Sequence, residues 1–239
     1  MVRNAVAKEA VRVLAWCLMA LTLLLGACAA PPLSLTAQVR QSIEQVEAVL
    51  LIPQTGIDVT VTPTEGGGGG FLGVLLAAAI DSAREASAKK TSAPIVEALR
   101  SFDFRAVMAQ AVATEQSRYP RLRARTPWRL ETVDSESHRR SVFDASSDSA
   151  VLFNRVSYRL ESGNLYVTSD VQIFPKAAGL ARFRPKPNDG NPLDEGNAFY
   201  RKTFVSVHQN VTASGVAAAL TDAANSVAAQ LLADLDRDS

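Results

Sequence analysis

The sequence predicts an α+β fold, in which a mainly antiparallel sheet is covered by helices, in a single domain that follows a short amino-terminal leader. Two observations carry this prediction. Segments with alternating apolar and polar residues, typical of half-buried strands, occur before and after a block of segments with helical spacing. In addition, 47% of the 239 residues are apolar and only 6% are aromatic, which describes an ordinary globular chain.

The amino terminus has the parts of a secretion signal. Arg3, Lys8 and Arg12 give it a positive start, and residues 13–25 form an apolar core. This core is too short for a membrane span, which needs about 20 residues. Residues 1–27 are therefore expected to be a targeting segment that lies outside the fold.

The leader ends in a recognisable motif. Leu25, Gly26, Ala27 and Cys28 resemble the lipobox of bacterial lipoproteins, in which the cysteine receives a diacylglycerol and cleavage occurs just before it. The resemblance implies a mature chain held on a membrane by palmitate-type acyl chains on Cys28, and several chains at one residue anchor stably. Ala29 follows, where the usual inner-membrane retention signal is Asp, so the resemblance implies the outer membrane, facing the periplasm.

Cysteine content limits the chemistry of the mature chain. The sequence has two cysteines, Cys17 in the apolar core of the leader and Cys28. Removal of the leader would leave the acylated Cys28 alone, which excludes an intramolecular disulfide and a thiolate metal site. We expect a semi-rigid, proline-containing tether over residues 28–37 and one domain over residues 38–239.

The first elements of the domain are expected to be two strands joined by a tight turn. An apolar, β-rich run over residues 46–52 ends before Pro53. Residues 57–62 alternate apolar and polar side chains, which is typical of a strand with one buried face. The turn falls at residues 54–56.

Five glycines at residues 66–70 open onto an apolar run at residues 71–80, and residues 81–90 continue its helical spacing. Three interpretations compete. A phosphate-binding loop would need a lysine at its end or a spaced glycine fingerprint, and neither is present. A membrane-inserting or pore-forming segment would need more length. A flexible loop that leads into a partly buried helix explains the pattern most simply.

Two amphipathic helices are expected next, over residues 92–100 and 102–117, because apolar residues recur there at steps of three and four. A strand should follow at residues 129–133. Residues 135–149 are rich in Ser and Asp and are expected to form a loop.

The clearest element is a β-hairpin. Residues 151–160 and 165–175 alternate apolar and polar side chains, and residues 161–164 supply turn chemistry. A polar loop rich in Pro and Gly, residues 186–197, leads into a last strand at residues 198–210.

A helix laid on the sheet is expected at the carboxyl end, over residues 213–236, because apolar residues recur at steps of three and four. The acidic residues Asp234, Asp236 and Asp238 are expected to be a frayed, solvated terminus.

The most cationic stretch, residues 118–129, interleaves arginines with Tyr, Trp and Pro. It has two interpretations: an edge that contacts lipid phosphates or an acidic partner, or a solvated loop that leads into a strand. Its arginines are Arg118, Arg121, Arg123, Arg125 and Arg129. The whole chain has a net charge of +1, and without its basic leader it is near neutral. We therefore expect no nucleic-acid partner.

No motif for a cofactor, a metal or catalysis emerges. The two histidines, His138 and His208, are too far apart in sequence for a zinc pair on one helix. The nucleophile elbow G-x-S-x-G does not occur. The acidic residues Asp189, Asp194 and Glu195 lack the spacing of a calcium-binding hand.

The sequence favours a non-enzymatic, lipid-anchored envelope protein that binds or assembles a periplasmic or outer-membrane protein partner. One alternative is a periplasmic hydrolase or carbohydrate-binding protein, and another is a subunit of a membrane-associated secretion or pore assembly. A pocket near His208 or paired carboxylates would favour the hydrolase. A flat face with exposed apolar residues would favour a partner site.

Overall fold

The computed structural model describes residues 32–60, 86–87, 90–119 and 122–237. The compact unit that concerns the fold is Leu33–Ser239. The predicted leader, Cys28 and most of the tether lie outside the described residues, as do the glycine run and the apolar segment that follows it.

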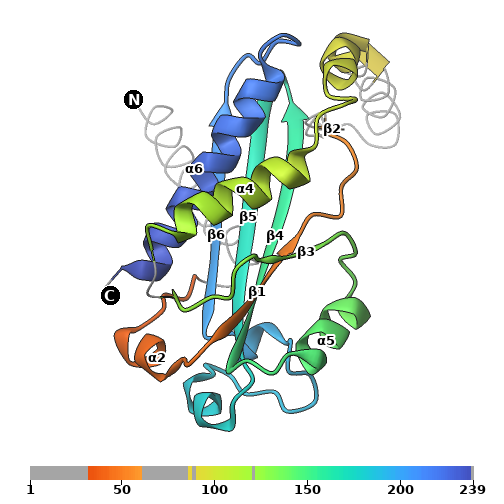
Figure 1. The fold of residues 1–239 in the computed structure, drawn as a ribbon. Coiled ribbons are helices and arrows are strands. Elements are labelled where there is room, and N and C mark those ends of the chain that lie inside the picture. The colour runs from red at the N-terminus through yellow and green to blue at the C-terminus, as the bar shows by residue number, and fades with distance from the viewer. Residues whose placement is uncertain (1–31, 61–85, 88–89, 120–121, 238–239) are drawn as a thin grey trace, which may run out of the picture. The chain divides into compact units, whose positions relative to one another are not determined.

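Six strands form one mixed sheet (Figure 1). Its order is β3-β1-β4-β5-β6, and β2 pairs with β4 beyond this path. The pairs β4–β5 and β5–β6 are antiparallel, whereas β1–β3, β1–β4 and β2–β4 are parallel. The α+β class is confirmed, with parallel pairs that the sequence did not predict. The strands are β1 Val46–Leu51, β2 Asp58–Thr60, β3 Arg129–Glu131, β4 Ala150–Glu161, β5 Asn164–Pro175 and β6 Tyr200–His208.

Both predicted strands are present, but the tight turn predicted between them at residues 54–56 is wrong, because both run parallel to β4 and the chain does not reverse between them. β1 and β2 pair one after the other with the same strand, β4. Gln54 lies between the two strands in the sequence, and its side chain holds this connecting segment against β4. Its amide nitrogen donates to the Tyr158 carbonyl at 3.0 Å, and its amide oxygen accepts from the Tyr158 N–H at 2.8 Å. The Gln54 side chain thus takes the place of a backbone partner on β4.

The predicted hairpin is confirmed. β4 and β5 pair over their full length, from Ala150 opposite Pro175 to Glu161 opposite Asn164. The turn residues Ser162 and Gly163 have φ values of 51° and 79°. Two consecutive left-handed residues are what a two-residue turn needs to match the twist of the strands.

Helices α4 (Phe104–Gln116) and α6 (Val216–Asp236) cover one face of the sheet, called here the inner face (Figure 1). Both confirm the sequence prediction, as does a helix over residues 90–98. Among the described residues, α6 is the one helix with the length and hydropathy of a membrane span. Its apolar stripe is instead buried in the core, because Leu220, Val227 and Leu231 are each fully buried.

Helix α5 (Glu136–Ala145) corrects the loop predicted at residues 135–149. Ser135 caps this helix, because its hydroxyl accepts the His138 N–H at 3.2 Å. Val142 and Phe143 are buried with Phe153 and Phe174 on the outer face of the sheet. Helix α5 is mostly polar and buries only one apolar pair, so its Ser- and Asp-rich composition indicated a loop although its apolar residues lie on one side of the helix.

The folded domain also begins earlier than residue 38. Leu33 pairs with Arg201 on β6 through two backbone hydrogen bonds of 2.8 and 3.1 Å. Leu35 is buried, and helix α2 (Ala37–Ser42) follows it. The last part of the predicted tether is therefore part of the fold.

Candidate partner-binding surface

Among the described residues, the outer face of the sheet is covered by other elements at one end and by none at the other. Helix α5 and the loop before β6 bury the end that carries Phe153 and Phe174. Farther along, strands β4, β5 and β6 present a row of side chains that are exposed or half-buried. We call this surface the outer strip. It comprises Arg155, Ser157, Arg159, Tyr166, Thr168, Asp170, Thr203, Val205 and Val207.

The strand register arranges the outer strip in rows across the sheet, since directly opposed residues share a face. One row runs Arg159, Tyr166, Val207. The Arg159 guanidinium lies 4.5 Å from the centre of the Tyr166 ring, a cation–π contact. The next row ends at Val205. Val205 and Val207 are 46% and 47% exposed, so they form an apolar end to these rows.

Charged groups in the outer strip already have partners. Arg155 pairs with Asp134 at 2.7 Å, and the Thr203 hydroxyl donates to Asp170 at 2.6 Å. Arg159 also pairs with Glu161, at 3.3 Å. The two valines at the β6 edge are therefore the part of this surface that gains most from being covered.

Strand β6 is also an edge of the sheet. Arg201 directs its N–H and C=O away from β5, toward Leu33. Because successive residues of a strand direct these groups to opposite sides, Thr203, Val205 and Val207 direct theirs to the same outer edge. Among the described residues, no strand pairs with this part of the edge. The edge thus offers three N–H donors and three carbonyl acceptors.

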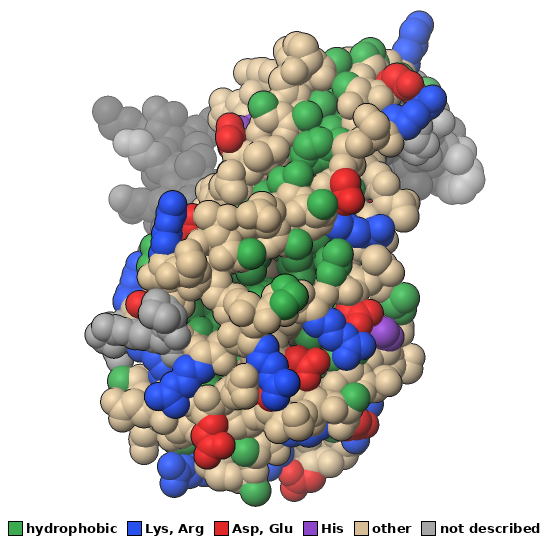
Figure 2. All heavy atoms as spheres, viewed as in Figure 1, with side chains coloured by type: hydrophobic (Ala, Val, Ile, Leu, Met, Phe, Trp, Pro, Cys, Tyr) green, Lys and Arg blue, Asp and Glu red, His purple; other side chains and the backbone are tan. Residues whose placement is uncertain are grey.

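The arginines predicted to contact an anion or a partner do not gather into a free basic patch. Each of the four described ones has an intramolecular partner. Arg118 pairs with Glu115 at 2.6 Å and Arg123 donates to the Ile43 carbonyl at 3.2 Å. Arg125 pairs with Asp148, and Arg129 pairs with Glu131 at 2.5 Å. Figure 2 shows Lys and Arg mixed with Asp and Glu on this side of the domain. Arg121 lies outside the described residues.

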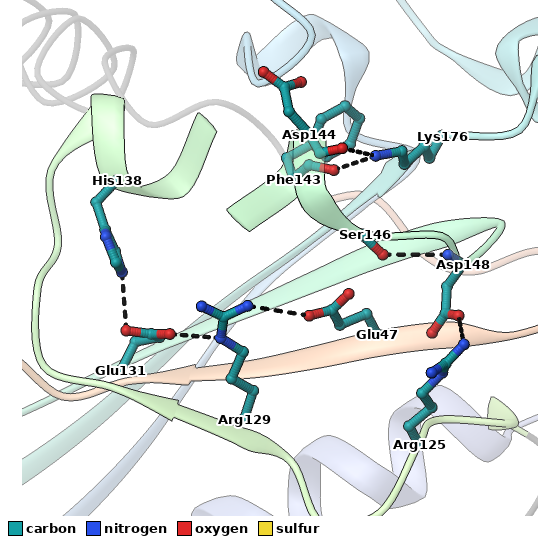
Figure 3. A network of polar contacts seen from close by, with 10 residues as sticks. All are labelled: Glu47, Arg125, Arg129, Glu131, His138, Phe143, Asp144, Ser146, Asp148 and Lys176. Carbon is teal, nitrogen blue, oxygen red and sulfur yellow. Dashed lines mark hydrogen bonds and ion pairs between the residues drawn. The ribbon is translucent and has the colours of Figure 1, made fainter. Parts of the chain in front are cut away.

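Glu131 is the centre of the polar network in Figure 3. It accepts from Arg129 and lies 2.9 Å from the Nε2 atom of His138. Burial alone would raise the pKa of Glu131. The hydrogen bonds and charges of Arg129 and His138 outweigh that effect, so the pKa lies below its usual value. Glu47 extends the network by pairing with Arg129 at 3.7 Å. This network holds β3 and α5 together.

A cleft of about 650 Å³ lies where β4 turns into β5. It is lined by hydroxyl groups such as those of Thr60, Thr91 and Thr212, together with the apolar side chains of Ile95 and Leu160. Its described lining contains no Asp, Glu, His or Cys. The described residues therefore place no acid–base pair in it.

The remaining candidates for chemistry stay apart. His208 is half-buried at the end of β6 and does not line the cleft. Asp189 pairs with Arg184 at 3.0 Å, and Glu195 pairs with Arg201 at 3.1 Å. No cluster of three potential metal ligands occurs among the described residues.

Asp234 is a residue whose importance the sequence did not reveal. The expectation of a frayed, solvated terminus is wrong for it. Asp234 accepts the Tyr200 hydroxyl at 2.9 Å and the Lys202 ammonium at 2.5 Å, which ties the end of α6 to β6. No local pattern could have found this contact, because the partners lie 34 and 32 positions away in sequence.

Comparison with known proteins adds a similarity of structure only. No family model matches the sequence, and no curated protein matches it either. The structure is similar to the PelC dodecamer from Paraburkholderia phytofirmans, with 13% identity and a TM-score of 0.33, over 88% of this chain and 96% of that one. A substituted form of the same dodecamer gives 12% identity and a TM-score of 0.32, over 87% and 94%. At these values the similarity carries no argument about function.

Proposed function

We propose that this chain is a lipid-anchored envelope protein of the outer membrane, facing the periplasm, which binds a protein partner without catalysing a reaction. The partner contributes an extended segment that adds to the free edge of β6 and rests on the adjoining outer strip. The observation that carries this proposal is the edge at Thr203, Val205 and Val207, with which no strand pairs among the described residues.

Natural proteins usually protect such an edge with a charge, a proline, a bulge or a covering segment. In the part of the chain that the structure describes, strand β6 has none of these at its carboxyl end, because its pairing with β5 is regular over all nine residues and its outward residues there are Thr and Val. Of the described residues, Leu33 covers the amino-terminal end of this edge. If the antiparallel pairing of Leu33 with Arg201 continued along β6, residue 31 would lie opposite Thr203. Pro31 has no N–H group and could donate no backbone hydrogen bond there. The tether is thus poorly suited to extend along the edge.

Strand addition suits a tethered protein. Main-chain hydrogen bonds supply the affinity, and side chains that alternate along the added strand supply the specificity. Each net hydrogen bond is worth about 1 kcal/mol, so the three donors and three acceptors give a modest affinity on their own. A lipid on Cys28 would raise the local concentration of the domain at the membrane, where a weak contact becomes occupied.

The partner contact is tested with a photoreactive residue at position 203 in living cells. We expect adducts with an envelope protein that Val205→Lys combined with Val207→Lys abolishes, because two lysines on the edge oppose strand addition. Val96→Lys is the matched control, since Val96 is 44% exposed but lies off the sheet. Adducts that persist in the double variant would overturn the edge as the site. So would turnover of an ester, peptide or glycan that His208→Ala abolishes in a folded protein.

The anchor is tested separately. Cys28→Ala should abolish incorporation of labelled palmitate and stop normal maturation, because the thiol is the acylated group. Ser34→Ala is a suitable control, as it changes a small residue beyond the motif. Unchanged labelling of the Cys28→Ala protein would refute the lipid anchor while leaving the partner test unaffected.

A further inference from the structure

We propose that the segment of residues 176–188 is a membrane-facing surface that contacts anionic lipid headgroups. This inference rests on the lipid anchor at Cys28 and extends it, because it assigns the side of the domain that faces the bilayer. Two independent observations support it: where the tether enters the fold, and the charge of the segment beside that point.

The tether restricts the domain to the membrane surface. Leu33 is fixed to β6, and it follows Cys28 by five residues. An extended chain spans at most about 3.5 Å per residue, so Leu33 lies within about 17 Å of an acylated Cys28. The part of the domain around Leu33 must therefore stay near the headgroups.

Contacts connect Leu33 to the basic segment. Arg201, the backbone partner of Leu33, forms an ion pair with Glu195 at 3.1 Å. The next residue, Gly196, accepts the Lys186 N–H at 3.0 Å. Helix α2, which follows the tether, also packs against the 3-10 helix η2 (Ala178–Phe183). Figure 1 shows α2 at the same end of the sheet as the loops after β5, and the helix over residues 90–98 at the opposite end.

The segment is strongly cationic. Residues 176–188 contain four basic residues and no acidic residue. Lys176 bonds the Asp144 carbonyl at 2.7 Å, and Arg184 pairs with Asp189 at 3.0 Å. Arg182 and Lys186 are both exposed. The structure gives neither of them an acidic partner among the described residues. The Arg182 guanidinium lies 4.8 Å from the centre of the Phe183 ring, which leaves its charge available to a phosphate.

The segment is held in place for such a contact. Leu180 is 2% exposed and packs in the core, and Phe183 packs against the same core. Farther along, the buried Asn197 side chain donates to the carbonyls of Asn188 and Asn191 at 2.6 and 2.7 Å. These contacts order the loop, so little conformational entropy is lost when its cations meet headgroups.

The test uses the lipidated mature protein in vesicles of phosphatidylethanolamine with or without phosphatidylglycerol. A fluorophore on Ala178→Cys reports its distance from a quencher on the lipid headgroups. This cysteine is the one free thiol, since Cys28 is acylated and Cys17 leaves with the leader. Ser101→Cys, at the opposite end of the domain, is the control label. We expect quenching at position 178, stronger with phosphatidylglycerol, and little quenching at position 101. A label on Pro187→Cys, exposed in the same segment, repeats the measurement if Ala178→Cys does not fold.

The charges are tested with Arg182→Gln combined with Lys186→Gln. Each basic residue near an anionic surface contributes about fivefold to the equilibrium, so the pair should lower the ratio of docked to undocked domain roughly thirtyfold. Lys90→Gln with Arg100→Gln, the same loss of charge at the opposite end, should leave the ratio unchanged. Equal quenching at both labels, or no effect of the double variant or of phosphatidylglycerol, would overturn the proposal. A mass spectrum that shows no acyl group on the protein would overturn the lipid anchor as well. This measurement distinguishes failure of the anchor from failure of the membrane-facing surface.

Discussion

Replacing Asp234 tests the contact that joins the end of α6 to the sheet. The Tyr200 side chain is fully buried, and its hydroxyl has the Asp234 carboxylate as its partner at 2.9 Å. The Lys202 ammonium approaches the other carboxylate oxygen at 2.5 Å, and the Lys202 side chain is 32% exposed. Asp234→Ala would leave the phenol without a partner in the core.

The expected loss follows from these two interactions. A buried hydroxyl without a partner costs about 1–3 kcal/mol, and a half-exposed ion pair contributes about 1 kcal/mol or less. Asp234→Ala should therefore lower the free energy of unfolding by about 3 kcal/mol. Tyr200→Phe removes the donor together with its need for a partner and should cost about 1 kcal/mol. The double variant should be less destabilised than the two single losses added together, by about 1 kcal/mol.

Urea unfolding followed by circular dichroism measures these free energies on the chain that begins at Ala29. Asp222→Ala is the control, because Asp222 is an exposed acidic residue of the same helix, and it should change stability by less than about 0.5 kcal/mol. The reasoning is refuted if Asp234→Ala costs no more than Asp222→Ala. It is also refuted if the losses from Asp234→Ala and Tyr200→Phe are simply additive.

Three further outcomes are expected. In an alkaline titration followed by phenolate absorbance, Tyr158 and Tyr200 should resist ionisation, because burial raises the pKa of both above the usual 10.0. Since the unfolded chain ionises first, stability should fall as the pH rises above about 10, and Tyr200→Phe should lessen that fall. The pKa of Glu131 is lowered in the folded protein, so the ionised carboxylate contributes stability above about pH 4.5 that is lost as the pH falls. The urea midpoint of Glu131→Gln should therefore change less on acidification than that of the unsubstituted protein. Gly163→Ala, at a φ of 79°, should cost about 1 kcal/mol in the same urea assay, whereas Gly179→Ala should be nearly neutral.

The parts of the fold that the sequence predicted are those with a strong local period. The hairpin of β4 and β5 alternates in steps of two, and α6 repeats in steps of three and four, so each is legible without its neighbours. The parallel pairing of β1 with β4 is different, because residues such as Val49 and Phe153 are about a hundred positions apart. The continuous apolar run of β1 is typical of a central strand of this kind, since a strand buried on both faces shows no alternation of apolar and polar residues.

The candidate surface could not be predicted, because it depends on what fails to cover the sheet. Val205 and Val207 look like ordinary strand residues in the sequence. Their exposure follows from the fold: β6 is an edge strand, and α5 covers the other end of the outer face. The partners of the arginines in residues 118–129 could not be predicted either. A cationic sequence shows the charge, whereas the carboxylates that pair with Arg125 and Arg129 come from elsewhere in the fold.

The open part of the outer face follows from the lengths of the helices on the two sides. Strands β4 and β5 have 12 residues each, and at about 3.3 Å per residue each is about 40 Å long. Helix α6 has 21 residues and at 1.5 Å per residue extends about 31 Å along the inner face. Helix α5 has 10 residues and extends about 15 Å. A helix of that length can shelter Phe153 and Phe174 but cannot reach Tyr166 and Val207, so none of the described helices covers this part of the outer strip.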